Sequence, residues 1–200
     1  MTNPLFIEVL KVKNGMFVDP EPHLKRIFRT RLHFFAEPLS VNLTNDMIPN
    51  DLRTGLLKCR IVYGKEVVSI EFEPYKMRNI QSLTIIENNT IDYSHKYFNR
   101  DIINELFSQR GESDDILIVK NSLVTDTSYT NVVFKDYKGR LFTPSSTLLS
   151  GIKRKKLLDA GIIREKEICV KDIKSYEGVF LINTMIDIED KLFISVDSIY

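Results

Sequence analysis

Two stretches of the chain read Val124-Thr125-Asp126-Thr127-Ser128-Tyr129-Thr130-Asn131 and Thr143-Pro144-Ser145-Ser146-Thr147-Leu148-Leu149-Ser150-Gly151-Ile152-Lys153-Arg154. Short runs of β-branched and aromatic residues flank the first stretch, and such runs are typical of strands. Read by itself, Asp126 is an aspartate in a turn that follows a strand. The second stretch leads into a helical pattern at residues 151–160, with its leucines turned inward and its basic residues mostly outward. The two stretches therefore predict strands, polar turns and a helix that begins at Gly151.

The first part of the chain is predicted to contain two β-hairpins and one helix. One hairpin pairs residues 5–10 with residues 16–18 around Asn14-Gly15, a dipeptide favoured in two-residue hairpin turns. The other hairpin occupies residues 59–73. Between them, apolar residues recur at helical spacing among basic residues over 24–35, which predicts an amphipathic helix.

The second part of the chain is predicted to be rich in strands. It opens with a strand at residues 80–87 and a helix at residues 101–109. Further strands are expected at residues 116–119, 131–134, 140–142, 167–170 and 179–182. No regular alternation of strand and helix is present, which indicates the α+β class. We expect two domains, residues 1–76 and residues 77–200.

The composition is that of a globular protein without a strong net charge. The chain has 200 residues, of which 43% are hydrophobic and 28% charged, so it can bury a core without disulfides or metals. Its 28 Lys and Arg residues nearly balance its 27 Asp and Glu residues, which argues against a nucleic-acid partner or a membrane surface and favours a small-molecule ligand. The sequence shows no signal peptide and no membrane-spanning segment, and we therefore expect a cytoplasmic location. With three histidines, and with Cys59 and Cys169 far apart, no metal site is expected.

Two further segments, His23-Leu24-Lys25-Arg26 and Tyr93-Ser94-His95-Lys96-Tyr97, complete a series of four. In their order and approximate spacing, the four segments resemble the class IV aminotransferase family, the fold-type IV enzymes that use pyridoxal 5'-phosphate (PLP). That family includes branched-chain and D-amino-acid transaminases and aminodeoxychorismate lyases. The resemblance covers most of the chain and is strongest over residues 82–184. It implies a two-domain fold like that of D-amino-acid aminotransferase with a shortened N-terminal domain, and a homodimer.

The resemblance implies roles for Lys96 and Asp126. Lys96 stands at the position of the lysine that carries PLP as a Schiff base, in the larger C-terminal domain and just before a helix. Such a lysine acts as nucleophile and base only where its surroundings lower its pKa. Asp126 matches the acid, usually glutamate in the family, that faces the pyridine nitrogen of PLP and keeps the ring protonated. Because aspartate is one methylene shorter than glutamate, the ring would have to lie closer or tilt.

The resemblance assigns the cofactor phosphate to three places in the chain. Arg26 matches the arginine of an H-x-x-R motif, whose planar guanidinium suits a phosphate. The backbone N–H groups of Gly151 and Ile152 match a cradle at a helix start, where the helix dipole favours an anion. Lys153 stands where the family commonly has threonine, so it either contacts the phosphate or is solvated. The pair Asn183-Thr184 matches a loop that supports the phosphate, with a simple strand-end turn as the alternative.

The implied reaction begins when a substrate amine displaces Lys96 from PLP and the freed lysine removes the Cα proton. Reprotonation at the cofactor then gives transamination, whereas loss of pyruvate from aminodeoxychorismate gives 4-aminobenzoate. The compact opening Leu5-Phe6-Ile7-Glu8 looks more like that of the lyases, so an aminodeoxychorismate lyase is expected. An amino-acid transaminase of the branched-chain or D-amino-acid type is the alternative. A protein that binds PLP without turnover is a third interpretation, because the N-terminal domain is short and Lys153 departs from the family pattern.

Overall fold

The computed structural model describes residues 3–38 and 40–200, and the chain divides into two compact units. The first unit extends to Met77 and also contains His95–Asn99, whereas the second contains Arg78–Ser94 and Arg100–Tyr200. Within the described ranges, no helix is long and apolar enough to cross a membrane. The mixture of helices and sheets confirms the expected α+β class.

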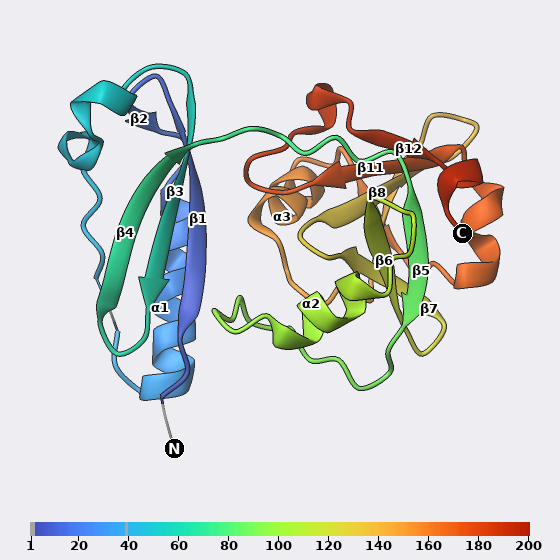
Figure 1. Cartoon of the computed structure of the whole chain (residues 1–200), viewed down its shortest axis with the longest axis horizontal. Helices are drawn as coiled ribbons and strands as arrows, with labels where there is room; N and C mark the ends of the chain where they lie inside the picture. The colour runs from blue at the N-terminus through green and yellow to red at the C-terminus, as the bar shows by residue number, and fades with distance from the viewer. Residues whose placement is uncertain (1–2, 39) are drawn as a thin grey trace. The chain divides into compact units, whose positions relative to one another are not determined.

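The first unit is an antiparallel sheet with the order β2-β1-β3-β4 and a helix along it (Figure 1). Its elements are β1 (Phe6–Lys13), β2 (Met16–Phe17), α1 (Glu21–Phe35), β3 (Leu56–Tyr63) and β4 (Val67–Pro74), with short 3-10 helices at Asn45–Met47 and Asn50–Leu52. Both predicted hairpins and the predicted helix are confirmed. Asn14 and Gly15 have φ values of 50° and 74°, as the tight turn between β1 and β2 requires.

One face of β1 lies in the core of this unit. Phe6, Leu10 and Val12 alternate along the strand and are fully buried, since successive strand residues point to opposite faces. They pack in one cluster with Ile27, Ile48, Leu57, Cys59, Ile61 and Tyr63. Glu8 follows the same alternation and is also fully buried, although its side chain is charged. A carboxylate in this position requires partners, because burying an unpaired charge is costly.

The segment His95–Asn99 belongs to the first unit, and this corrects the expectation that Lys96 lies in the larger unit. Ile7 N donates to the Lys96 carbonyl (2.9 Å), and Phe98 N donates to the Leu5 carbonyl (2.8 Å). The Tyr97 ring lies 5.3 Å from that of Phe6. These contacts attach the segment to the start of β1. A stretch that is distant in sequence thus becomes part of the smaller unit.

The second unit is a larger mixed sheet with the strand order β10-β9-β8-β7-β6-β5 and with β11 and β12 attached through β8 (Figure 1). Its strands are β5 (Leu83–Glu87), β6 (Asp115–Lys120), β7 (Leu123–Thr127), β8 (Asn131–Lys135), β9 (Leu141–Pro144), β10 (Arg164–Lys166), β11 (Gly178–Ile182) and β12 (Phe193–Ser195). The pairs β5–β6 and β9–β10 are parallel. Because β8 pairs with β7, β9 and β11, the stretches at residues 124–131 and 143–154 meet around it.

Two α-helices complete the second unit, together with three short 3-10 helices. They are α2 (Asp101–Ser108) and α3 (Ile152–Asp159), and the 3-10 helices are Val170–Ser175, Ile188–Asp190 and Val196–Ser198. The leucines of α3 pack against a cluster around Val133 and Ile182, as the sequence predicts. The strand expected at residues 167–170 is wrong. The chain instead forms β10 before it and a 3-10 helix from Val170 onward.

Arg154 of α3 is buried rather than solvated as its helical position predicts. Its Nε donates to Thr143 Oγ1 (3.1 Å), and its Nη2 donates to the Pro144 carbonyl (2.8 Å) and to Glu165 (2.6 Å). A basic residue can be buried when its donors are paired in this way. Arg154 therefore ties α3 to the end of β9 and to β10.

Candidate functional site

Asp126, near the end of β7, accepts four hydrogen bonds and is buried. Oδ1 accepts from Asn131 Nδ2 (2.7 Å) and Thr147 Oγ1 (2.6 Å), while Oδ2 accepts from the backbone N–H groups of Leu148 (3.0 Å) and Leu149 (2.9 Å). Burial raises the pKa of Asp126, and the hydrogen bonds, that of Leu149 first, partly oppose this rise. Asp126 is thus joined to the loop that precedes α3.

Asn131 and Gly151 also hold the loop that precedes α3 in place. Asn131 Nδ2 also lies 2.9 Å from both Thr147 Oγ1 and the Leu149 carbonyl. A Cβ atom on Gly151 would lie only 1.9 Å from Asn131 Oδ1, so the glycine is required for the close approach of the two chains. The start of α3 is therefore placed by contacts with β7 and β8.

Replacing Gly151 with alanine is expected to destabilise the protein by about 1–3 kcal/mol, because the new Cβ displaces Asn131 from its partners. The free energy of unfolding in urea measures this loss. Asn131→Ala removes the clashing atom, so the cost of Gly151→Ala should largely disappear in the double variant. Costs that simply add in the double variant would contradict this explanation.

The first N–H groups of α3 are available to an anion. Gly151 is the N-cap residue and Ile152 begins the helix. Among the residues that the structure describes, no acceptor binds the N–H group of Gly151 or of Ile152. Because the first N–H groups of a helix carry its positive dipole end, they favour a negatively charged ligand.

Lys153 forms an ion pair with Asp187, in the segment that follows β11. This contact differs from both sequence expectations for Lys153, which were a phosphate contact or a solvated side chain. The pair is partly exposed, with 19% of the Lys153 side chain and 31% of the Asp187 side chain accessible. Lys153 thus joins the first turn of α3 to the turn at residues 183–187.

Asn183 and Thr184 form the turn after β11. Asn183 Oδ1 accepts from the N–H groups of Met185 (2.8 Å) and Ile186 (3.1 Å), which is the hydrogen bonding of a strand-end turn. Asn183 Nδ2 lies 3.4 Å from the Tyr129 carbonyl, in the loop between β7 and β8. These contacts connect Asn183 with the loop between β7 and β8, and the Lys153–Asp187 ion pair connects the same turn with the start of α3.

Arg26 lies in the first unit, where it pairs with Glu8. Its Nε and Nη2 donate to the two carboxylate oxygens of Glu8, at 2.8 and 2.6 Å, and His23 Nδ1 lies 2.7 Å from Glu8 Oε1. Burial alone would raise the pKa of Glu8, but the charge of Arg26 and the hydrogen bonds from His23 and Arg26 lower it to about 2. Glu8 therefore remains ionised and orients the guanidinium of Arg26.

The comparison with known proteins identifies the family. Residues 67–189 match the family model described as amino-transferase class IV. The chain belongs to this family. Its members are PLP-dependent enzymes, and the expectation from the four sequence segments is confirmed at this level.

Three individual proteins similar to this class IV chain can be compared with it. An uncharacterized protein of Haemophilus influenzae is 35% identical over 186 residues, which cover 91% of this chain and 97% of that protein. The crystal structure of a proposed 4-amino-4-deoxychorismate lyase from Haemophilus somnus has a TM-score of 0.79 and 29% identity, covering 92% of this chain and 98% of the other. The branched-chain aminotransferase of Escherichia coli shares the fold, with a TM-score of 0.69 at 16% identity over 98% of this chain and 77% of its own.

The class IV family implies PLP as cofactor, and the residues of the second unit fit its phosphate group. The N–H groups of Gly151 and Ile152 are donors without a protein acceptor in the described part of the chain, as a phosphate group requires. The ring end differs. A carboxylate has about four lone-pair sites, and four donors already occupy those of Asp126. In this arrangement Asp126 has no lone pair left for the pyridine nitrogen. The expected contact between the two stays a prediction.

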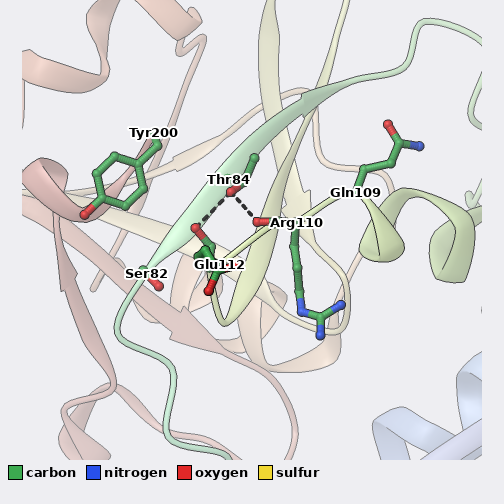
Figure 2. A pocket seen from close by; sticks show the side chains of 8 residues that line it. Ser82, Thr84, Gln109, Arg110, Glu112 and Tyr200 are labelled. Carbon is green, nitrogen blue, oxygen red and sulfur yellow. Dashed lines mark hydrogen bonds between the residues drawn. The ribbon is translucent and has the colours of Figure 1, made fainter.

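A pocket of about 460 Å³ in the second unit contains none of the predicted site residues. Ser82, Thr84, Arg110 and Tyr200 are among the residues that line it (Figure 2). Thr84 Oγ1 hydrogen-bonds to the Arg110 carbonyl (2.7 Å) and to Ser113 Oγ (2.8 Å). These hydrogen bonds, drawn as dashed lines in Figure 2, join β5 to the loop after α2.

Two residues of the candidate site, Glu8 and Thr147, were not predicted from the sequence. Glu8 binds His23 and Arg26, the two ends of the predicted H-x-x-R segment, and Thr147 binds Asp126. One signal was available for Glu8, because it interrupts the apolar face Phe6-Leu10-Val12 of a predicted strand and so demands a buried cation. For Thr147 no such signal exists, because a threonine in a polar loop is ordinary.

Proposed function

We propose that this class IV enzyme binds PLP through Lys96. The proposed phosphate ligands are Arg26 and the backbone N–H groups of Gly151 and Ile152, with the turn at Asn183-Thr184 as their support. Lys153 remains beside this cradle, where its pairing with Asp187 holds the first turn of α3. The observation that carries the proposal is the pair of N–H donors at the start of α3 that lack a protein acceptor in the described ranges.

Lys96 is suited to covalent attachment because its backbone is fixed. The carbonyl of Lys96 accepts from Ile7 N (2.9 Å), and its neighbours His95 and Tyr97 pack against the rings of Phe34 and Phe6. A catalytic side chain on a rigid backbone loses less conformational freedom when it reacts. When bound, PLP supplies an electron sink for the carbon that carries the substrate amine. Once the substrate amine has displaced Lys96, its freed Nζ would be the base that takes the proton from that carbon.

We propose 4-amino-4-deoxychorismate as the substrate, converted to 4-aminobenzoate and pyruvate. The support is the Haemophilus somnus protein, a proposed lyase of this kind. The match covers 98% of the Haemophilus somnus chain and 92% of this chain. The reaction balances without a second substrate, because the proton removed by Lys96 can be returned to the departing enolpyruvyl group. An amino-acid transaminase would instead need a keto acid as a second substrate.

One paired assay tests this proposal. Purified protein with added PLP is given 4-amino-4-deoxychorismate, and release of 4-aminobenzoate and pyruvate is measured beside keto-acid formation from L- and D-amino acids. The proposal predicts equal amounts of 4-aminobenzoate and pyruvate. Keto-acid formation alone would identify a transaminase. Protein that binds PLP but is inactive in both assays would support the interpretation as a PLP-binding protein without turnover.

Assembly and location are part of the same proposal. We propose a homodimer located in the cytoplasm, as the resemblance to the family implies. Light scattering coupled to size-exclusion chromatography measures the mass directly. One chain has a mass of 23.3 kDa, so the measured mass of the particle should be about twice this value. A mass equal to that of one chain would contradict the dimer.

A further inference from the structure

Asp126 is engaged by the loop before α3 at both of its carboxylate oxygens. The two oxygens have different kinds of partner. Oδ1 accepts from two side chains, and Oδ2 accepts from two successive backbone N–H groups. Hydrogen bonds to an ionised acceptor are stronger than those between neutral groups. Asp126 is therefore the acceptor on which residues 147–149 converge.

The position of this loop determines where the anion donors of α3 lie. Leu149, whose N–H binds Asp126, is followed in the chain by Ser150 and then by Gly151, the N-cap of α3. Ser146 adds a hydrogen bond from its Oγ to the Val124 carbonyl (2.7 Å), so β7 holds the loop at two places. A change at Asp126 would thus be transmitted to Gly151 through only a few peptide bonds.

We propose that Asp126 is a positioning residue, which presets the N–H groups of Gly151 and Ile152 for the cofactor phosphate instead of pairing with the pyridine nitrogen. This inference rests on the proposed function, because it takes PLP as the ligand. It also gives a reason for aspartate at this position. The side chain of glutamate is one methylene longer and would push the carboxylate into the loop that Asp126 holds.

Asp126→Asn is the first variant that tests the inference. An amide replaces one acceptor oxygen by an NH2 donor, which must then face either Asn131 and Thr147 or the N–H groups of Leu148 and Leu149. We expect the dissociation constants for PLP and for inorganic phosphate to rise together, by about ten- to a hundredfold. A residue that serves only the ring nitrogen would leave the affinity for inorganic phosphate unchanged.

Thr147→Val separates the positioning role from the ring role more sharply, because Thr147 binds Asp126 and has no counterpart among the ring contacts that the resemblance implies. It should weaken PLP and phosphate binding in the same direction as Asp126→Asn, by about fivefold or more. Thr84→Val is the matched control, since it removes one hydroxyl that hydrogen-bonds to a backbone carbonyl elsewhere in the unit. Its affinity for both ligands should equal that of the unaltered protein. Thermal unfolding of each variant establishes that it is folded.

Asp126→Glu completes the test, because it restores the acid that is usual in the family. A positioning role predicts weaker binding of PLP and phosphate, whereas a ring partner predicts binding at least as tight as that of the unaltered protein. If the unaltered protein binds neither PLP nor phosphate, the proposed function fails and the inference fails with it. If the unaltered protein binds both and the Asp126 and Thr147 variants bind them equally well, only the positioning role is overturned.

Discussion

Lys96→Ala is expected to lower turnover of 4-amino-4-deoxychorismate by about a thousandfold or more, because it removes both the covalent anchor and the general base. The loss should be larger than that of any phosphate ligand, since those residues bind the cofactor without reacting. The variant should still fold, because the contacts of the segment 95–99 with β1 run through backbone atoms and through its neighbouring rings. The initial rate of 4-aminobenzoate release at saturating PLP measures the effect.

Borohydride reduction links this prediction to the chemistry of Lys96. Reduction should fix the cofactor to the unaltered chain, and peptide mapping should find it on Lys96. The matched control is Lys138→Ala, which removes an exposed lysine in the turn between β8 and β9. Its rate and its labelling should equal those of the unaltered protein. Cofactor fixed elsewhere in the chain, or a Lys96→Ala variant that retains a tenth of the activity, would exclude Lys96 from the assigned role.

The elements of the fold could be predicted where a local pattern determines them. The Asn14-Gly15 turn, the amphipathic helix at residues 24–35 and the hairpin of β3 and β4 all follow from spacing alone. Two features could not be predicted in this way. The return of His95–Asn99 to the first unit depends on backbone pairing with residues far away in sequence. Arg154 is buried because acceptors from β9 and β10 surround it, which its own helix does not reveal.

The candidate site shows the same limit. The residue types and their order led to the family, which the comparison confirms. The specific role of Asp126 could not be derived in this way, because it depends on which donors reach its carboxylate. Thr147, Leu148 and Leu149 are ordinary loop residues in the sequence, yet in the fold they supply three of its four hydrogen bonds. The sequence therefore predicts which residue types form a site better than it predicts the hydrogen bonds that determine the role of each residue.

Glu8→Gln is expected to destabilise the protein by about 3–5 kcal/mol, because it leaves the guanidinium of Arg26 without its buried counterion. Glu8 is fully buried, and the side chain of Arg26 is only 19% exposed, so water cannot replace the lost charge. The matched control is Glu71→Gln, because Glu71 pairs with Arg60 at 3.7 Å but is 60% exposed. The control should cost less than about 1 kcal/mol. Urea unfolding near neutral pH measures both free energies.

The pH dependence of this difference tests its electrostatic origin. Folding lowers the pKa of Glu8 from its ordinary value of 4.5 to about 2. A lowered pKa means that the unfolded chain takes up the proton first, so the stabilisation is complete above pH 4.5 and declines as the pH falls toward 2. The span corresponds to about 3 kcal/mol. The advantage of the unaltered protein over Glu8→Gln should therefore shrink between about pH 5 and pH 3. A difference from Glu8→Gln that stays constant over this range would show that lost packing, not the lost charge, destabilises the variant.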